Sequence, residues 1–198
     1  AAVLAQAGYF PENLLDDFYG YKTLMGMHPD IKVAGVEMST GGLGHGLSVG
    51  VGMALGARLQ DKDFRTVVML GDGELQEGSN WEAAMAAAKF GLADLCAIVD
   101  YNKVQQSGRI EEMNGLDPLA DKWRAFGWTV REIDGHDMAA IVDALDDLPY
   151  ATDAPSLLIA HTIKGKGVSF AEDTYLWHNN AVTDEILANA LTELGDPA

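Results

Sequence analysis

Polar and acidic residues directly follow two short apolar runs in this chain. The run Thr66–Leu70 leads into Gly-Asp-Gly-Glu at 71–74, and the run Leu95–Val99 leads into a segment that contains Asn102, 30 residues after Asp72. If the runs are neighbouring parallel strands, their carboxyl ends place a carboxylate and an amide oxygen side by side. Such hard oxygen ligands suit Mg²⁺ or Ca²⁺, with substrate phosphates completing the shell. Because an Asp between glycines is commonly just a turn, the spacing to Asn102 carries the metal hypothesis.

Strand and helix patterns alternate along the chain. The runs at 66–70 and 95–99 and a third at Ser156–Ala160 are typical of buried parallel strands, and Trp128–Ile133 fits a fourth less cleanly because charges interrupt it. Helical patterns occupy the intervals Leu43–Leu59, Asn80–Phe90, Asp117–Phe126, Met138–Leu148 and Asp184–Leu194. This alternation predicts an α/β fold with a doubly wound, mostly parallel sheet and helices on both faces.

Residues that typically cap helices refine these expectations. Asp117 before Pro118 predicts an N-cap and first-turn pair for the third helix, while Asp137 and Thr183 are expected to cap the two helices that follow them. No stretch resembles a linker long enough to divide the chain. We therefore expect residues 1–198 to form a single domain.

Composition excludes several classes of function. The chain is 48% hydrophobic and 22% charged, and its 13 basic against 30 acidic residues give a net charge of −17. This balance argues against nonspecific nucleic-acid binding or attraction to an anionic membrane, and an anionic ligand would need a metal, backbone N–H groups or a partner's cations. The one cysteine, Cys96, excludes an intrachain disulfide. Without a long apolar run or a basic leader, a soluble cytoplasmic protein is expected.

The segment from Gly71 to Asn102 resembles the thiamine-diphosphate motif of the transketolase family, which opens with GDG and closes with Asn. Similar segments span nearly the whole chain: HPD at 28–30, GVEMSTGGLGHGLSVGVGMALGARL, LADKWRAFGW, IDGHD and TIKGKGVSF. They are most similar to the amino-terminal subunits of split transketolases, whose two halves are separate polypeptides. The resemblance implies a thiamine-diphosphate-binding domain of the pyrophosphate type.

The resemblance also implies a metal and cofactor site. Asp72 and Asn102, through side-chain oxygens, and Val104, through its main-chain carbonyl, would ligate Mg²⁺, with Ca²⁺ or Mn²⁺ as substitutes. Gly73 would offer its N–H to the diphosphate, and Asn102 would also contact the cofactor. The family loop that lies along the aminopyrimidine and thiazolium corresponds here to Gly41, Gly42 and Leu43.

Three further residues match catalytic positions of the family. His28 corresponds to a histidine that contacts the donor ketose, and His178 to one that follows the KGKG loop and faces both substrate and cofactor. Neutral imidazoles there could move protons on and off substrate hydroxyls near pH 7. Glu77 corresponds to a glutamate near the family's dimer interface that is thought to couple two active sites; on the residues alone it is a solvated first-turn carboxylate.

The chain departs from the family pattern in three places. The family's Ser-x-Gly-His motif would precede Ala1, so we expect the extreme amino-terminal segment to be missing. Gln106 stands where relatives usually carry an aliphatic residue against the thiazolium. Asn179 follows His178 where glycine is usual, which is expected to alter the fit of the substrate.

The expected activity is transfer of a two-carbon ketol unit from a ketose phosphate to an aldose. The family's pyrimidine-binding domain does not fit in 198 residues, so we expect activity only with a carboxyl-terminal partner subunit, in a heterotetramer. Two alternatives stay open: a non-catalytic or regulatory cofactor-binding subunit, and half of a deoxyxylulose-phosphate synthase or a 2-oxo acid dehydrogenase E1 component. A nucleotide-binding domain using GLGHG is disfavoured, because no acidic ribose ligand follows a strand at the usual spacing.

Overall fold

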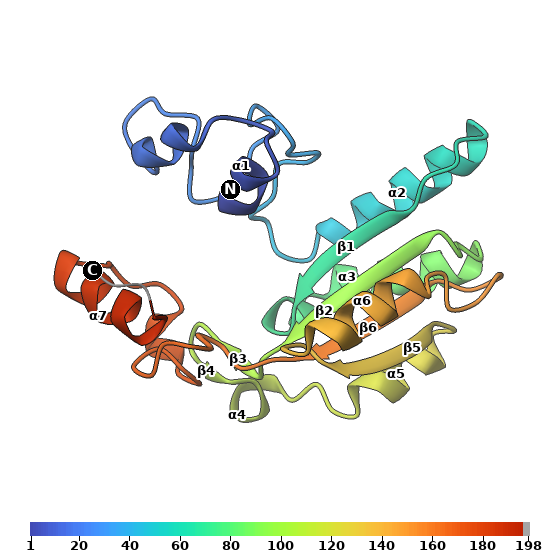
Figure 1. Cartoon of the computed structure of the whole chain (residues 1–198). Coiled ribbons are helices and arrows are strands. Elements are labelled where there is room, and N and C mark those ends of the chain that lie inside the picture. The colour runs from blue at the N-terminus through green and yellow to red at the C-terminus, as the bar shows by residue number, and fades with distance from the viewer. Residues whose placement is uncertain (196–198) are drawn as a thin grey trace. The chain divides into compact units, whose positions relative to one another are not determined.

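The computed structural model describes residues 1–195, and the chain divides into two compact units, Ala1–Leu43 and the part from Gly44 onward (Figure 1). The first unit contains the short helix α1 (Ala2–Gln6) and the 3-10 helix η1 (Glu12–Asp17). The rest of this unit consists of turns around a small apolar cluster, whose buried members are Ala5, Phe10, Met25 and Val33.

The second unit is built on a four-stranded parallel sheet. Its strands are β1 (Thr66–Gly71), β2 (Leu95–Tyr101), β6 (Ser156–His161) and β5 (Thr129–Asp134), in that spatial order. The register pairs Gly71 with Asp100, so β1 and β2 end at the same edge. All four predicted strands are confirmed, including the one interrupted by charges, which lies at the sheet's outer edge where solvent can reach its polar residues.

Helices cover both faces of this sheet, as predicted. The chain steps in one direction from β1 through α3 (Gly78–Lys89) to β2 and through α5 (Leu119–Ala125) to β5, then returns through α6 (Met138–Asp146) to β6. Because parallel crossovers are right-handed, the reversal puts α6 on the opposite face from α3 and α5. Figure 1 shows this doubly wound arrangement, with α2 (Gly46–Leu59) beside α3 and β1.

A tryptophan cluster fills the core between the sheet and the helices α3 and α5. Trp123 and Trp128 are buried, their rings meet edge to face at 4.8 Å, and Trp81 lies 5.5 Å from Trp123. The Trp128 indole donates a hydrogen bond to the Ala84 carbonyl at 3.0 Å. Trp123, Trp128 and Cys96 are buried, and Trp81 is partly buried against them.

Glycine spacing in α2 permits close contact with the sheet. A Cβ atom added at Gly50 would lie 2.5 Å from Val68 Cγ2 of β1, closer than real Cβ contacts occur. The helix begins at Gly46 rather than at Leu43. The predicted start of this helix is therefore three residues early.

Several short elements have no counterpart in the predictions. They are the hairpin of β3 (Val104–Gln105) and β4 (Gly108–Arg109), the helix α4 (Ile110–Asn114) and the 3-10 helices η2 (Gly73–Gln76) and η3 (Tyr175–Trp177). Each is too short for a hydrophobic period to reveal it. The last described helix, α7 (Asp184–Glu193), has the predicted Thr183 cap, and Asp137 caps α6 as expected.

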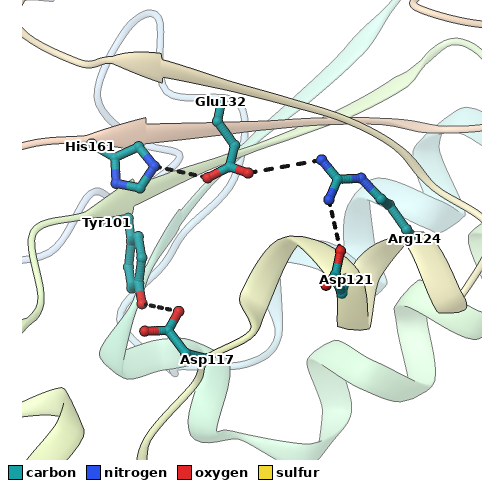
Figure 2. Close-up of polar contacts among 6 residues, drawn as sticks. All are labelled: Tyr101, Asp117, Asp121, Arg124, Glu132 and His161. Carbon is teal, nitrogen blue, oxygen red and sulfur yellow. Dashed lines mark hydrogen bonds and ion pairs between the residues drawn. The ribbon is translucent and has the colours of Figure 1, made fainter.

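The predicted cap of the third helix is wrong. Pro118 is the N-cap and Leu119 the first helical residue of α5, and Pro118 follows a cis peptide bond. The Asp117 carboxylate accepts a hydrogen bond from the Tyr101 hydroxyl at 2.8 Å (Figure 2). Because Tyr101 is buried at the end of β2, its hydroxyl needs an acceptor, and Asp117 supplies one instead of capping the helix.

Within residues 1–195, none of the helices has the length and apolar character needed to cross a membrane.

Candidate functional site

Asp72 is a buried carboxylate at the carboxyl end of β1. It is 2% exposed, and its two oxygens accept the N–H groups of Gly73, at 2.7 Å, and Lys103, at 2.5 Å. Burial is the largest influence on this carboxyl and raises its pKa above the ordinary value of 3.8, against the two hydrogen bonds that lower it. Within the described part of the chain, no cationic side chain forms an ion pair with Asp72. A buried carboxylate without an ion-pair partner is suited to bind a cation supplied from outside the chain.

Asn102 follows the neighbouring strand, as the spacing predicted. Its side-chain oxygen accepts the Val104 N–H at 2.9 Å, and its side-chain nitrogen donates to Asp100 at 3.2 Å. Val104 begins the β3–β4 hairpin, where it pairs with Arg109. The end of β2 and the hairpin thus place Asn102 and Val104 immediately beside Lys103, whose N–H reaches Asp72.

The donor set fits a hard divalent cation. Asp72 offers a carboxylate, Asn102 an amide oxygen with a second lone pair, and Val104 a main-chain carbonyl. Protein oxygens of this number leave positions for phosphate oxygens and water, which is the usual environment of Mg²⁺. The described residues hold no cluster of three or more His, Cys, Asp or Glu side chains with metal-site geometry, so an all-carboxylate or zinc-type site is not formed by them.

Of the two glycines of the GDG turn, Gly73 has less space for a side chain than Gly71. Neither Gly71 nor Gly73 adopts a positive φ, so a left-handed turn does not require them. Gly73 starts η2, and a Cβ added to it would lie 3.0 Å from the Gln105 Cβ of the hairpin. Close approach of the hairpin therefore favours glycine at 73. Its N–H, expected to bind the diphosphate, donates to Asp72 in this structure.

Glu74 ties the start of α2 to the end of β1. One carboxylate oxygen accepts the Gly44 N–H at 2.9 Å and the other accepts the Gly71 N–H at 3.2 Å. The Ser79 hydroxyl donates to the Gly44 carbonyl at 2.8 Å, so both main-chain groups of Gly44 are held. Gly44 has a φ of +83° and no room for a Cβ against Glu77 and Ser79. Sequence reasoning missed Glu74, because nothing in the sequence marks a contact that spans 30 residues.

Glu77 lies at the beginning of α3, where it is the N-cap residue with an exposed side chain. Its side chain makes no capping hydrogen bond. This position agrees with the plain interpretation of a solvated carboxylate near a helix N-terminus, and the coupling role implied by the family stays a prediction.

The loop after β6, residues 162–173, is held by contacts at both of its ends. The Ile163 N–H donates to His136 Nε2 at 2.8 Å, so that histidine holds the start of the loop. Near the other end, Asp173 forms a two-bond ion pair with Arg109 of β4, the shorter bond being 2.6 Å. The loop that contains the KGKG sequence is therefore tied to the hairpin that follows Asn102.

His178 follows this loop and ends η3. The residue is exposed, but part of its ring is shielded from water; this partial desolvation is the main cause that lowers its pKa from the ordinary value of 6.5, and the positive charge of Lys164 lowers it further. A lowered pKa favours the neutral imidazole near pH 7, the form that can accept a proton. The positive charge of Lys164 also lowers the pKa of Asp72, so this one lysine acts on both predicted site residues.

His161, at the end of β6, is already paired. Its Nε2 lies 2.9 Å from Glu132 of β5, and Glu132 also faces Arg124 of α5 at 3.8 Å (Figure 2). The ring lies 5.5 Å from that of Tyr101. These contacts give His161 a structural place at the rim of the sheet.

In the first unit, His28 lies against the glycine loop. A Cβ added at Gly41, which has a φ of +122°, would come within 2.8 Å of the His28 ring, and the Thr40 N–H donates to the Pro29 carbonyl at 3.1 Å. His28, Gly42 and Leu43 are exposed. The structure therefore brings His28 and Gly41 together, and only glycine at 41 permits this contact.

Comparisons with known proteins match these features. Residues 4–197 fit the family model described as transketolase, thiamine diphosphate binding domain. The chain is 42% identical to an apulose-4-phosphate transketolase subunit of Phocaeicola vulgatus, over 98% of this chain and 69% of that protein. It is 45% identical to the 6-deoxy-6-sulfo-D-fructose transketolase subunit SqwG of a Clostridium species, over 98% of this chain and 70% of that protein.

The chain belongs to the transketolase family. Solved transketolases share its fold: the enzyme from Leishmania mexicana superposes with a TM-score of 0.88 at 28% identity, over 98% of this chain and 31% of that one. The Campylobacter jejuni enzyme gives 0.86 at 29% identity, over 92% and 30%. The chain is thus a transketolase-type transferase subunit, with the α/β fold of the family's thiamine-diphosphate-binding domain.

Proposed function

We propose that this chain is the thiamine-diphosphate- and Mg²⁺-binding subunit of a transketolase that moves a two-carbon ketol unit from a ketose phosphate, or a closely related sugar, to an aldose. The observation that carries the proposal is the buried Asp72, joined through the Lys103 N–H to the segment of Asn102 and Val104. This edge offers one carboxylate and two neutral oxygens, the donors that would hold Mg²⁺.

The roles of the chain's own residues follow from their positions. Asp72, Asn102 and Val104 would hold the metal, and Gly73 would turn its N–H to the diphosphate. The cofactor, when bound, supplies the carbon nucleophile that accepts the two-carbon unit. His178, whose lowered pKa favours the neutral form, would accept and return protons at substrate hydroxyls, together with His28.

The proposed roles also extend to the glycine loop and to Glu77. The loop of Gly41, Gly42 and Leu43 would lie along the cofactor's rings, a role that fits the left-handed backbone of Gly41. Glu77 would meet its symmetry mate near the dimer interface and couple two active sites. We further propose that residues 1–198 act as one functional domain.

A partner subunit forms part of the proposal. Two of the relatives described above are named as transketolase subunits, and each of those alignments spans 98% of this chain. The partner would carry the pyrimidine-binding domain, and the assembly would be a heterotetramer. A net charge of −17 gives this chain few cations for sugar phosphates, so the partner is expected to supply them.

Native mass spectrometry of the natural full-length chain, purified from its own cells with Mg²⁺ and thiamine diphosphate, tests the assembly. We expect a stoichiometric complex with a second chain that carries cofactor mass. The complex is then assayed with fructose 6-phosphate, 6-deoxy-6-sulfo-D-fructose and pyruvate as donors. Ketol transfer by the isolated chain would contradict the partner requirement, and turnover of pyruvate alone would contradict the transketolase assignment.

A further inference from the structure

The side-chain amide of Asn102 faces two partners of opposite kind. Its nitrogen donates to an Asp100 oxygen at 3.2 Å, and its oxygen accepts the Val104 N–H at 2.9 Å. An ionised carboxylate can only accept hydrogen bonds and a main-chain N–H can only donate one. Only one of the two orientations of the amide therefore satisfies both partners.

Asp100 occupies a central place at the carboxyl edge of the sheet. It lies in β2, in register with Gly71 of β1 and Ala160 of β6. The Asp100 oxygen that receives Asn102 also accepts a hydrogen bond from the Thr162 hydroxyl. A single carboxylate oxygen thus receives both Asn102 and the first residue of the loop after β6.

Thr162 is fixed by its backbone as well. Its N–H donates to the Tyr101 carbonyl at 3.4 Å, and the next residue, Ile163, donates to His136. The far end of the loop is paired through Asp173 with Arg109, so the loop is joined to the end of β2 at its start and to the hairpin at its far end. Asn102 and the loop after β6 therefore share one hydrogen-bond acceptor, the Asp100 carboxylate.

We propose that Asp100 is a positioning residue, which turns the amide oxygen of Asn102 toward the metal and, through Thr162, links this orientation to the loop after β6. The inference rests on the proposed function, since it takes Asn102 as a ligand of the bound metal. Replacing Asp100 by Asn would supply an NH₂ group that can donate to the Asn102 oxygen. The amide could then turn over, at the cost of the hydrogen bond from the Val104 N–H, and present its own NH₂, which a cation does not accept as a ligand.

The test is a Mg²⁺ titration of the natural full-length protein, in its assembled form and at saturating thiamine diphosphate, followed by calorimetry. We expect Asp100→Asn to weaken Mg²⁺ binding by about tenfold or more, the usual effect of removing a group that orients a metal ligand. Thr162→Val, which removes only the hydroxyl, should weaken it by a smaller factor. Thr162→Ser, which keeps the hydroxyl, should restore the wild-type affinity, a rescue that lost packing alone would not produce.

Three results would overturn the inference. The first is a folded Asp100→Asn protein with wild-type Mg²⁺ affinity, and the second is equal weakening by Thr162→Val and Thr162→Ser. If Asp100→Asn fails to fold, the Thr162→Val variant decides between the outcomes. The third overturning result is then a Thr162→Val protein with unchanged Mg²⁺ affinity. Asp72→Ala separates these from failure of the proposed function: loss of Mg²⁺ binding in that variant alone supports the function and rejects the inference, whereas a wild-type protein that binds no Mg²⁺ rejects both.

Discussion

The Asp72 carboxylate accepts the main-chain N–H of Lys103, a residue 31 positions later in the chain. This bond joins the turn after β1 to the turn after β2, so the residues proposed to hold the metal form one connected edge. The arrangement depends on the parallel pairing of β1 with β2, which brings Gly71 opposite Asp100.

Replacing Asp72 with alanine is expected to abolish retention of Mg²⁺ and thiamine diphosphate. The wild-type protein should melt at a higher temperature when both are added, because a ligand that binds only the folded state stabilises it. The variant should show no such increase in differential scanning fluorimetry. Asp94→Ala, at an exposed aspartate just before β2, serves as the control and should respond like the wild type. A full response in Asp72→Ala would remove Asp72 from the site.

Glu74→Gln should loosen the start of α2. A glutamine keeps one acceptor oxygen, so the N–H of either Gly44 or Gly71 loses its partner, at a cost of about 1–2 kcal/mol in the free energy of unfolding. Hydrogen exchange at these two amides, measured with urea unfolding, should report faster exchange and lower stability. Glu82→Gln, at an exposed position of α3, should change neither. Unaltered exchange in Glu74→Gln would show that Glu74 does not tie the two segments.

Removing the charge of Lys164 should raise the pKa of His178. The lysine disfavours the protonated ring, so Lys164→Gln should move the pKa toward 6.5 without reaching it, because burial is the larger cause and remains. NMR titration of the histidine ring signals measures this shift. Lys166→Gln is the matched control, because the Lys166 ammonium lies 3.7 Å from Glu172, and it should leave the pKa of His178 unchanged. Equal shifts in both variants would argue against a specific effect of Lys164.

The lowered pKa of His178 also predicts how the free energy of unfolding changes with pH. Folded His178 binds its proton less tightly than the unfolded chain does, so its contribution lowers stability as the pH falls through 6.5 toward the folded value. Unfolding by urea between pH 5 and 8 should therefore show a smaller loss on acidification in His178→Gln than in the wild type. An equal loss would show that His178 titrates alike in both states.

Two tryptophans of similar burial should respond differently to phenylalanine. Trp128 donates to the Ala84 carbonyl, whereas the Trp123 indole nitrogen has no hydrogen-bond partner within residues 1–195. Both substitutions leave a cavity, but only Trp128→Phe loses a hydrogen bond, so it should cost about 1 kcal/mol more. The comparison uses the free energy of unfolding in urea. A larger loss for Trp123→Phe would contradict the assignment.

The sequence by itself determined the class of fold and the family. Buried parallel strands are short apolar runs that can be recognised in the sequence. Capping residues such as Asp137 and Thr183 act on the helix that follows them, so these local signals predicted features that the structure contains. The spacing of Asp72 and Asn102 was informative because one strand–helix–strand unit brings successive strand ends together. Residue roles that came from the family resemblance, such as those of Glu77 and His28, stay predictions.

Only the tertiary structure decided which side chains pair at the edge of the sheet. Glu74 with Gly44, Asp100 with Thr162, and Tyr101 with Asp117 are contacts between segments that are distant in sequence. Local pattern placed Asp117 at a helix cap, and the need of a buried hydroxyl for an acceptor placed it elsewhere. Hydrogen bonds between distant segments leave no periodic trace in a sequence, because they arise only once the sheet has brought the strand ends together.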